Sequence, residues 1–164
     1  RRDFYLFGDK AMKEIPLTQR QVALVDDEDY DELMKYKWFA CKSCGLFYAR
    51  RYGGKYQKNI SMHSHITGYV RTDHIDGNGL NNSRGNLRKC SNAENIRNSK
   101  IRKDNSSGYK GVSFKRSNNK FQVRIRINAR DIHLGLFKTA LEAARAYNES
   151  AIKYFGEFAR LNDV

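Results

Sequence analysis

The sequence predicts an α+β protein in which a β-rich N-terminal region precedes a three-stranded antiparallel sheet packed on one helix. Three observations support this fold class. The segment KFQVRIRIN alternates strictly between apolar and polar residues, and TALEAARAYNESAIKYFG has apolar residues at helical spacing. Residues 15–70 contain short aromatic and β-branched runs separated by glycine and charged residues. The 164 residues suit one ordinary domain or two small ones.

The N-terminal region is expected to be irregular and rich in strands. The runs RQVALV, WFACK, LFYARR and KNISMHSHI are short, apolar and bounded by turn residues, which is typical of strands. A short helix is expected near residues 28–36. The run DDEDYDE, residues 26–32, overlaps the start of this expected helix and contains six acids. We interpret it as a solvated turn or helix start and assign it no chemistry.

The C-terminal sheet is predicted from period-two patterns in three segments. YKGVSFK places Val112 and Phe114 on one side, and IHLGLF places its three aliphatic residues together. In KFQVRIRIN the apolar face consists of Phe121, Val123, Ile125 and Ile127. Short turns between the three segments predict antiparallel pairing.

The helix that follows has clear start and stop signals. Thr139 and Glu142 have the spacing of a capping box, and Gly156 is a natural stop. Its apolar stripe is expected to contain Leu141, Ala144, Ala151, Ile152 and Phe155. This stripe should cover the apolar face of the sheet and leave the opposite, cationic face free.

The charge balance indicates a polyanionic partner. Lys and Arg number 31 against 18 acids, a net charge of +13. No apolar run approaches the roughly 18 residues of a membrane span, so we expect double-stranded DNA and no membrane. A β-ribbon fits the major groove, where arginine pairs with guanine, although a solvated strand face is the plainer alternative. The expected DNA contacts are Arg97, Lys100, Arg102, Lys103, Lys110, Lys115, Lys120, Arg124 and Arg126.

The chain is expected to divide at SKIRKDNSSG, residues 99–108, whose polar and basic composition is that of a linker. Residues 1–98 then form an N-terminal part, and residues 109–164 form the DNA-binding domain. The linker cations suit a phosphate backbone.

The segment from Thr72 to Asn98 is rich in asparagine and contains one Asp-His pair, Asp73-His74. VRTD and NLRKC suit two strands, and SNAENIRNS suits a helix start with Ser91 and Glu94 as a capping box. Histidine is the usual base near neutral pH, and carboxylate and amide oxygens are hard ligands suited to Mg²⁺. The order strand, loop, strand, helix therefore predicts a hairpin and a helix with a cation between them.

The C-terminal residues 109–162 resemble the AP-two/ERF type of DNA-binding domain. The matching features are the Tyr-Lys-Gly-Val start, the segment HLGLF, the helix motif EAARAY and the closing GEFARLN. The resemblance implies that the sheet enters the major groove, with Lys110, Lys115 and Arg126 at groove-facing positions. Ser113, Asp131 and His133 depart from the residues that plant domains have there, so a plant-type sequence preference does not follow.

The segment TDHIDGNGLNNSRGNLRKCSNAEN resembles the HNH (His-Me finger, ββα-metal) nucleases of phages and introns. The resemblance covers about residues 60–98, and residues 22–40 are similar to free-standing phage members. It implies that His74 is the general base. It also implies that Asp73 and Asn95 hold one Mg²⁺, for which Mn²⁺ can substitute, and that Asn86 braces the loop and orients His74. Asn78, Asn81 and Asn82 are expected to serve tight turns.

These features predict a metal-dependent DNA endonuclease of the homing type, sequence-tolerant but site-directed. One active site should nick one strand, and the protein can be a monomer or a homodimer. The alternatives are a non-catalytic DNA-binding regulator on an HNH scaffold and a non-specific toxin nuclease. An intracellular setting, the cytoplasm of a bacterial host, is expected for such a phage or mobile-element protein.

The cysteines favour neither disulfides nor zinc. Their number, three, is odd, and CKSC at 41–44 has no second knuckle to complete four ligands. We expect no structural zinc and interpret Cys41 and Cys44 as half-buried strand residues. His63 is interpreted as a surface or strand histidine, with a contact to the active site or DNA as the alternative.

Overall fold

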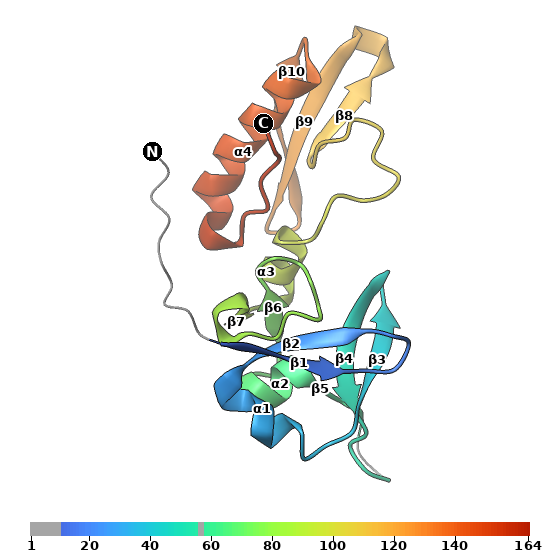
Figure 1. The fold of residues 1–164 in the computed structure, drawn as a ribbon. Coiled ribbons are helices and arrows are strands. Elements are labelled where there is room, and N and C mark those ends of the chain that lie inside the picture. The colour runs from blue at the N-terminus through green and yellow to red at the C-terminus, as the bar shows by residue number, and fades with distance from the viewer. Residues whose placement is uncertain (1–10, 56–57) are drawn as a thin grey trace. The chain divides into compact units, whose positions relative to one another are not determined.

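The computed structural model describes residues 11–55 and 58–164. Residues 1–10, part of the predicted N-terminal region, and residues 56–57 lie outside the described ranges. The chain forms two compact units, one up to Ser91 and one from Asn92 onward, and both combine helices with antiparallel strands (Figure 1). The predicted α+β class is therefore confirmed. The described helices include none long and apolar enough to cross a membrane.

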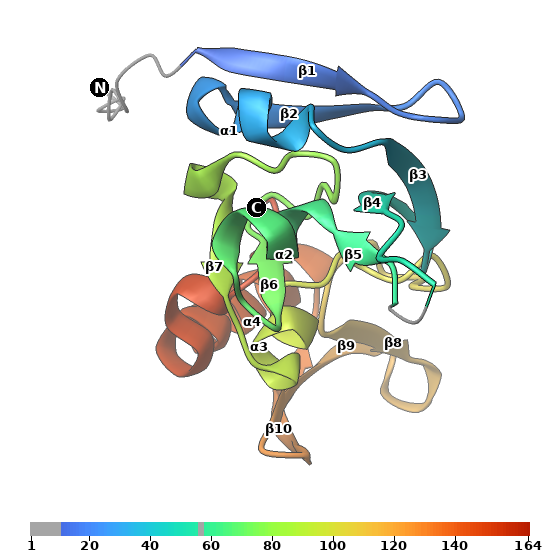
Figure 2. The same ribbon diagram turned by 90° about the horizontal axis from the view of Figure 1, so that it is seen from below.

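The first unit begins with a hairpin and a helix. Strand β1 (Met12–Pro16) pairs antiparallel with β2 (Val22–Asp26), and helix α1 (Asp27–Leu33) follows at once, close to where a helix was expected. Figure 2 shows α1 lying beside this hairpin. Alternate residues of β2 face a core that burial of apolar surface stabilises. That core contains Ile15, Ala23, Val25, Leu33, Trp38, Ala49 and Met62.

A second sheet continues the first unit. Strand β3 (Trp38–Ser43) pairs with β4 (Leu46–Arg51), and β4 pairs with the two-residue β5 (Ile60–Ser61). The expected strand over KNISMHSHI is wrong beyond residue 61, because residues Met62–Thr67 form helix α2. Gly68 ends this helix in the left-handed conformation at φ 69°, which glycine adopts readily.

The Asp-His segment folds as predicted into a hairpin followed by a helix. Strand β6 (Thr72–His74) pairs antiparallel with β7 (Leu87–Lys89), which follows a 3₁₀ turn, η1 (Arg84–Asn86). Helix α3 (Asn92–Arg97) comes next and belongs to the second compact unit. The unit boundary thus precedes α3, whereas we expected it after residue 98.

The second unit contains the predicted three-stranded sheet. Strands β8 (Val112–Lys115), β9 (Lys120–Ile127) and β10 (Arg130–Phe137) lie in the order β10-β9-β8, all antiparallel, and the turn η2 (Arg116–Asn118) joins the first two. Val123 and Ile125 are buried and the arginines between and beside them are exposed, which confirms the alternation of β9.

Strand β10 departs from simple alternation. A bulge between His133 and Gly135 shifts the register, so that Phe137 lies opposite Phe121 and packs on the core. Leu136 lies opposite Gln122 instead. The expectation that Ile132, Leu134 and Leu136 share the core face was therefore wrong, because an extra residue on one strand reverses the direction of all later side chains.

Helix α4 (Ala140–Phe155) packs along β9 and β10 (Figure 1). The capping box of Thr139 and Glu142 is confirmed, and Gly156 ends the helix before the turn η3 (Gly156–Phe158). The predicted stripe was partly wrong, since Leu141 and Ile152 are 42% and 56% exposed. The buried positions are Ala143, Ala144, Tyr147, Ala151 and Phe155, because small alanines let the helix approach the sheet closely.

Gly111 permits this close approach where β8 begins. Its φ is +76°, and a Cβ there would collide with the ring of Tyr147 on α4 and the carbonyl oxygen of Arg124. Gly108 has the same φ of +76° but nothing within 4 Å of such a Cβ. Substitutions at the two positions therefore distinguish the cost of a strained backbone, which both share, from the cost of a steric collision, which only Gly111 has.

We expect Gly111→Ala to destabilise the second unit much more than Gly108→Ala. Left-handed backbone costs an L-residue about 1–2 kcal/mol at either position, and overpacking adds about 1–3 kcal/mol at Gly111 alone. Urea unfolding followed by far-UV circular dichroism measures both. Equal destabilisation of the two variants would contradict the packing described here.

Candidate active site and nucleic-acid interface

The β6-β7 hairpin places Asp73 and His74 together in the first unit, with exposed fractions of 4% and 6%. The loop that joins the two strands is braced by Asn86. Its side-chain Nδ2 donates to Asp76 Oδ1 at 3.0 Å and to the Asn81 carbonyl at 2.8 Å, while its Oδ1 accepts from the Asp76 N–H at 3.0 Å. Asn86 therefore closes the loop as a rigid unit beside the Asp-His pair.

The ring of His74 contacts a residue for which the sequence predicted only a turn. Its Nε2 lies 3.4 Å from Oδ1 of Asn82, whose side chain is fully buried. An amide oxygen only accepts, so this contact favours the tautomer with the proton on Nε2 and the lone pair on Nδ1. We had interpreted Asn82 as a turn residue. The spacing of eight residues between Asn82 and His74 does not predict their contact, because only the folded loop brings the two side chains together.

Two further aromatic rings surround His74. His63 of α2 contacts it edge to face with ring centroids 5.1 Å apart, and Tyr48 of β4 lies at 5.9 Å. Burial lowers the pKa of His74, and this effect outweighs the Asn82 hydrogen bond and the Asp76 and Asp73 carboxylates, which act to raise the pKa. The ring is therefore kept in the neutral form that accepts a proton.

His63 is not the surface or strand histidine that we expected. It lies on helix α2 between Tyr48 and His74. Burial, aided by the charges of His74 and Arg50, lowers the pKa of His63 to about 4. The imidazole is therefore neutral at physiological pH and adds no second positive charge beside His74.

Asp76 is the ionised member of the loop. Burial acts to raise the pKa of Asp76, but hydrogen bonds from the Asn78 N–H and from the side chains of Asn81 and Asn86 outweigh it and lower the pKa. The Asn81 Nδ2 donates to Asp76 Oδ2 at 2.8 Å. The asparagine-rich composition of this segment thus holds one carboxylate by amide and backbone donors, which fixes the loop shape.

Asp73 is paired with an arginine of the neighbouring strand. Nε and one terminal nitrogen of Arg88 donate to Asp73 Oδ2 at 2.9 and 2.8 Å, and both side chains are withdrawn from solvent. Asn95, the other predicted metal ligand, lies on α3 in the second unit. A carboxylate and an amide oxygen form a donor set that suits a hard divalent cation.

The acidic run at residues 26–32 starts helix α1, as expected, and four of its six acids are exposed. Asp26 and Asp29 are buried, and both bind Arg84 of the hairpin loop. The Arg84 N–H donates to Asp26 Oδ2 at 2.8 Å, and its guanidinium donates to both oxygens of Asp29. Within the described ranges Asp26, Glu28 and Asp29 are the one group of three side chains with metal-ligand spacing. The arginine accounts for this clustering of acids.

The cysteines occupy three different environments. Cys41 is half-buried in β3 and Cys90 is buried, whereas Cys44 is exposed in the β3-β4 turn with φ of 49°. The interpretation of Cys44 as a half-buried strand residue was therefore wrong. CKSC is a strand end followed by a Cys-Gly turn.

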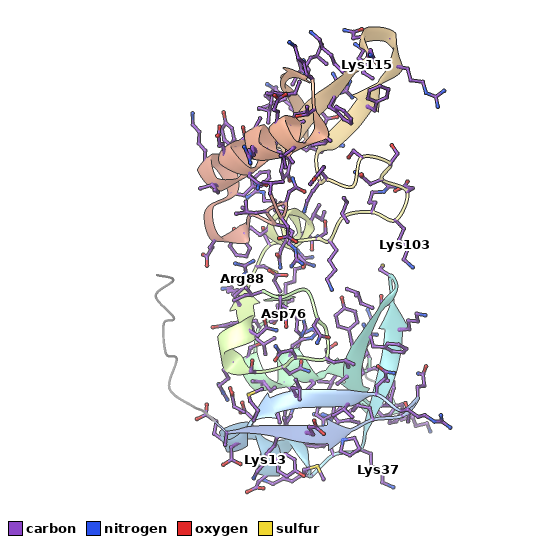
Figure 3. All side chains as sticks on the ribbon, turned by 45° about the horizontal axis from the view of Figure 1, so that its top comes forward. Lys13, Lys37, Asp76, Arg88, Lys103 and Lys115 are labelled. Carbon is purple, nitrogen blue, oxygen red and sulfur yellow. The ribbon has the colours of Figure 1, made fainter. Side chains whose placement is uncertain are left out.

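The second unit presents a cationic sheet face. Arg124 and Arg126 point away from α4, and Lys115 and Lys120 pair where β8 meets β9. Figure 3 shows Lys115 at this outer end of the sheet. Arg126 also lies 3.8 Å from Asp131 Oδ1, in an ion pair whose members are 70% and 55% exposed. Such an exposed pair is weak enough to exchange for phosphate.

The remaining candidate cations differ in how accessible they are. Lys100 and Lys103 are exposed, and Arg102 forms an exposed ion pair with Asp104 at 2.9 Å. The Arg97 guanidinium lies over the ring of Phe155, 4.8 Å from its centroid. Lys110 donates to two backbone carbonyls of the same unit. The sheet cations therefore lie on one face, whereas Arg97 and Lys110 contact other residues of the second unit.

Comparison with known proteins agrees with both halves of this description. No family model matches the chain. An uncharacterized HNH endonuclease of Acanthamoeba polyphaga mimivirus is 33% identical over 148 residues, which are 87% of this chain and 75% of that protein. An AP2-like ethylene-responsive transcription factor of Arabidopsis thaliana is 41% identical over 59 residues, and an APETALA2-like protein of rice is 42% identical over 57. These matches cover 36% and 35% of this chain, and 12% and 13% of the plant proteins.

The Asp-His hairpin and the cationic sheet together define a protein that acts on DNA. Its C-terminal unit is similar to the AP2/ERF type over about a third of the chain. The chain belongs to the HNH endonuclease family.

Proposed function

We propose that the protein is a divalent-metal-dependent DNA endonuclease of the homing type, which hydrolyses one phosphodiester at each active site and so nicks one strand. The observation that supports this most directly is the buried His74 beside Asp73, whose Nε2 lies 3.4 Å from Asn82 Oδ1 in a contact that favours one tautomer. A neutral imidazole with a defined lone pair is what a general base requires.

His74 acts in this proposal by accepting a proton from the attacking water at Nδ1. Asn82 holds the opposite ring nitrogen, and His63 and Tyr48 pack around the ring. Asn86 has an indirect part, because it fixes the loop that carries Asn82 through its bonds to Asp76 and Asn81. General base catalysis by a positioned side chain contributes about 10²–10⁴-fold to a rate.

Asp73 and Asn95 would hold the cation, Mg²⁺ or Mn²⁺, through one carboxylate and one amide oxygen. When bound, such an ion stabilises negative charge on the phosphate and the leaving oxygen. Arg88 orients Asp73 beside His74 by donating two hydrogen bonds to its Oδ2.

The C-terminal sheet would supply affinity and partial selectivity. Its cations suit both phosphate contacts and guanine edges in the major groove. Ser113, Asp131 and His133 stand on or beside the cationic face, so its base preference need not follow that of the plant domains. The basic residues of 99–108 would add sequence-independent contacts.

We expect Arg126→Ala to weaken DNA binding severalfold and to reduce the salt dependence of binding by about one unit of slope if the contact is to phosphate. Lys153→Ala is the matched control, because Lys153 is an exposed cation on α4 rather than on the sheet. Fluorescence anisotropy at several salt concentrations measures both variants. Equal losses would contradict the assignment of the sheet face.

A non-catalytic DNA-binding regulator is the second candidate. The Arg88 guanidinium on Asp73 Oδ2 favours it, since this arginine already neutralises the carboxylate that a cation would need. Supercoiled plasmids carrying a randomised insert distinguish the two candidates. The endonuclease converts them to open circles with Mg²⁺ or Mn²⁺ and not with a chelator. Binding without conversion under either metal would favour the regulator.

A further inference from the structure

Lys110 has an environment unlike that of the other candidate DNA-binding cations. Its Nζ donates to the backbone carbonyl oxygens of Arg97 and Ser99, each at 2.6 Å. These carbonyls lie at and just beyond the end of α3, where a helix has no partners of its own for them. Burial, together with the charge of Arg160, lowers the pKa of Lys110 to about 8. Lys110 is partly buried, and these two bonds engage its ammonium.

The backbone of Lys110 is fixed to the body of the second unit. Its N–H donates to Asn162 Oδ1 at 2.7 Å, and Asn162 Nδ2 donates to the Lys110 carbonyl at 3.2 Å. Asn162 in turn exchanges two hydrogen bonds with Asn148 of α4, at 2.8 and 2.9 Å. An unbroken series of bonds thus runs from α4 through Lys110 to the end of α3.

A second contact joins the same two helices. The Arg97 guanidinium, in the last turn of α3, lies over the ring of Phe155 at the end of α4. Such a contact contributes about 0.5–2 kcal/mol depending on its exposure. The short helix α3, which has six residues and is too short to be stable alone, is thus held by its C-terminal end.

We propose that Lys110 is a positioning residue that clamps α3 to the DNA-binding unit, so that the helix carrying Asn95 and the cationic sheet form one rigid body. This inference rests on the proposed function only for the role of Asn95. The clamp explains why an ammonium at a predicted groove-facing position donates to two carbonyls instead. The clamp also fixes the position of the proposed metal ligand relative to DNA bound by the sheet.

The test compares Lys110→Met with Lys115→Met, which removes an exposed cation from the sheet. Amide hydrogen exchange of residues 92–99 should quicken at least tenfold in Lys110→Met and stay unchanged in Lys115→Met, while exchange in β9 stays unchanged in both. DNA affinity, measured in a chelator, should fall less than threefold in Lys110→Met and more in Lys115→Met. At saturating DNA, the nicking rate of Lys110→Met should fall at least tenfold, and its half-saturating Mn²⁺ concentration should rise.

The outcomes separate the clamp from the proposed function. Unchanged exchange in residues 92–99, or faster exchange throughout β9 as well, overturns a local clamp. Faster exchange with normal nicking and normal Mn²⁺ dependence overturns the positioning of Asn95. A loss of DNA affinity equal to that of Lys115→Met, with an unchanged nicking rate at saturation, assigns Lys110 to DNA contact instead. If the wild-type protein does not nick, the proposed function fails, and the exchange measurement still decides the clamp.

Discussion

His74→Ala is expected to lower the nicking rate about 10²–10⁴-fold while DNA affinity stays within about twofold of wild type. The reason is that the imidazole accepts a proton in the transition state but is buried among Asn82, His63 and Tyr48 of the first unit, whereas the proposed DNA-binding sheet belongs to the second unit. Plasmid nicking at saturating DNA and Mg²⁺ gives the rate, and anisotropy in a chelator gives the affinity.

Chemical rescue provides the control for this experiment. The alanine leaves a ring-sized space beside Asn82, so added imidazole should restore part of the activity of His74→Ala. The rescue should be absent for Asp73→Ala, because imidazole does not replace a carboxylate. A nicking rate for His74→Ala within tenfold of wild type would exclude His74 as the base.

Arg88→Met is expected to destabilise the first unit by about 3–5 kcal/mol, because it removes the guanidinium that pairs with the buried Asp73 carboxylate. Methionine fills most of the volume of the arginine stem, so the loss reports charge rather than packing. Trp38 is the single tryptophan of the chain and is 7% exposed in the core of this unit. Its fluorescence during urea unfolding therefore measures the effect on this unit.

Lys35→Met serves as the control for Arg88→Met. It also breaks an ion pair in the first unit, but Lys35 and Glu32 are 65% and 51% exposed, and solvent screens such a pair. Its unfolding curve should nearly overlay that of the wild type. If Arg88→Met behaved like Lys35→Met, the pairing with Asp73 would not contribute to the stability of the folded hairpin.

The sequence was informative wherever one local pattern decided the structure. Strand β9 follows from its period-two alternation, and α4 begins directly after Thr139 because the capping box is complete within four residues. The β6-β7 hairpin and α3 were likewise predictable from short segments with turn residues between them. In each of these cases the deciding interactions are near in sequence.

The predictions from sequence were wrong where contacts between residues distant in sequence determine the local structure. Helix α2 forms over MHSHIT, although that segment resembles its neighbouring strands in composition. The bulge between His133 and Gly135 exchanges Leu136 for Phe137 in the core, and the glycine within this strand is its local signal. The contact of Asn82 with His74 depends on the closure of a loop that Asn86 braces. The roles of Asp73, His74, Asn86 and Asn95 remain proposals.

The hydrogen bonds that Arg84 makes to Asp26 through its backbone N–H and to Asp29 through its guanidinium have a consequence for protein engineering. They tie the β6-β7 loop to residues more than fifty positions earlier, and Leu24 also bridges to Asn81. A transplant of residues 60–98 alone into another scaffold would therefore leave Arg84 without its acceptors and the loop without its backing strand. A transplantable form of the Asp-His hairpin would therefore need β1, β2 and α1 as well.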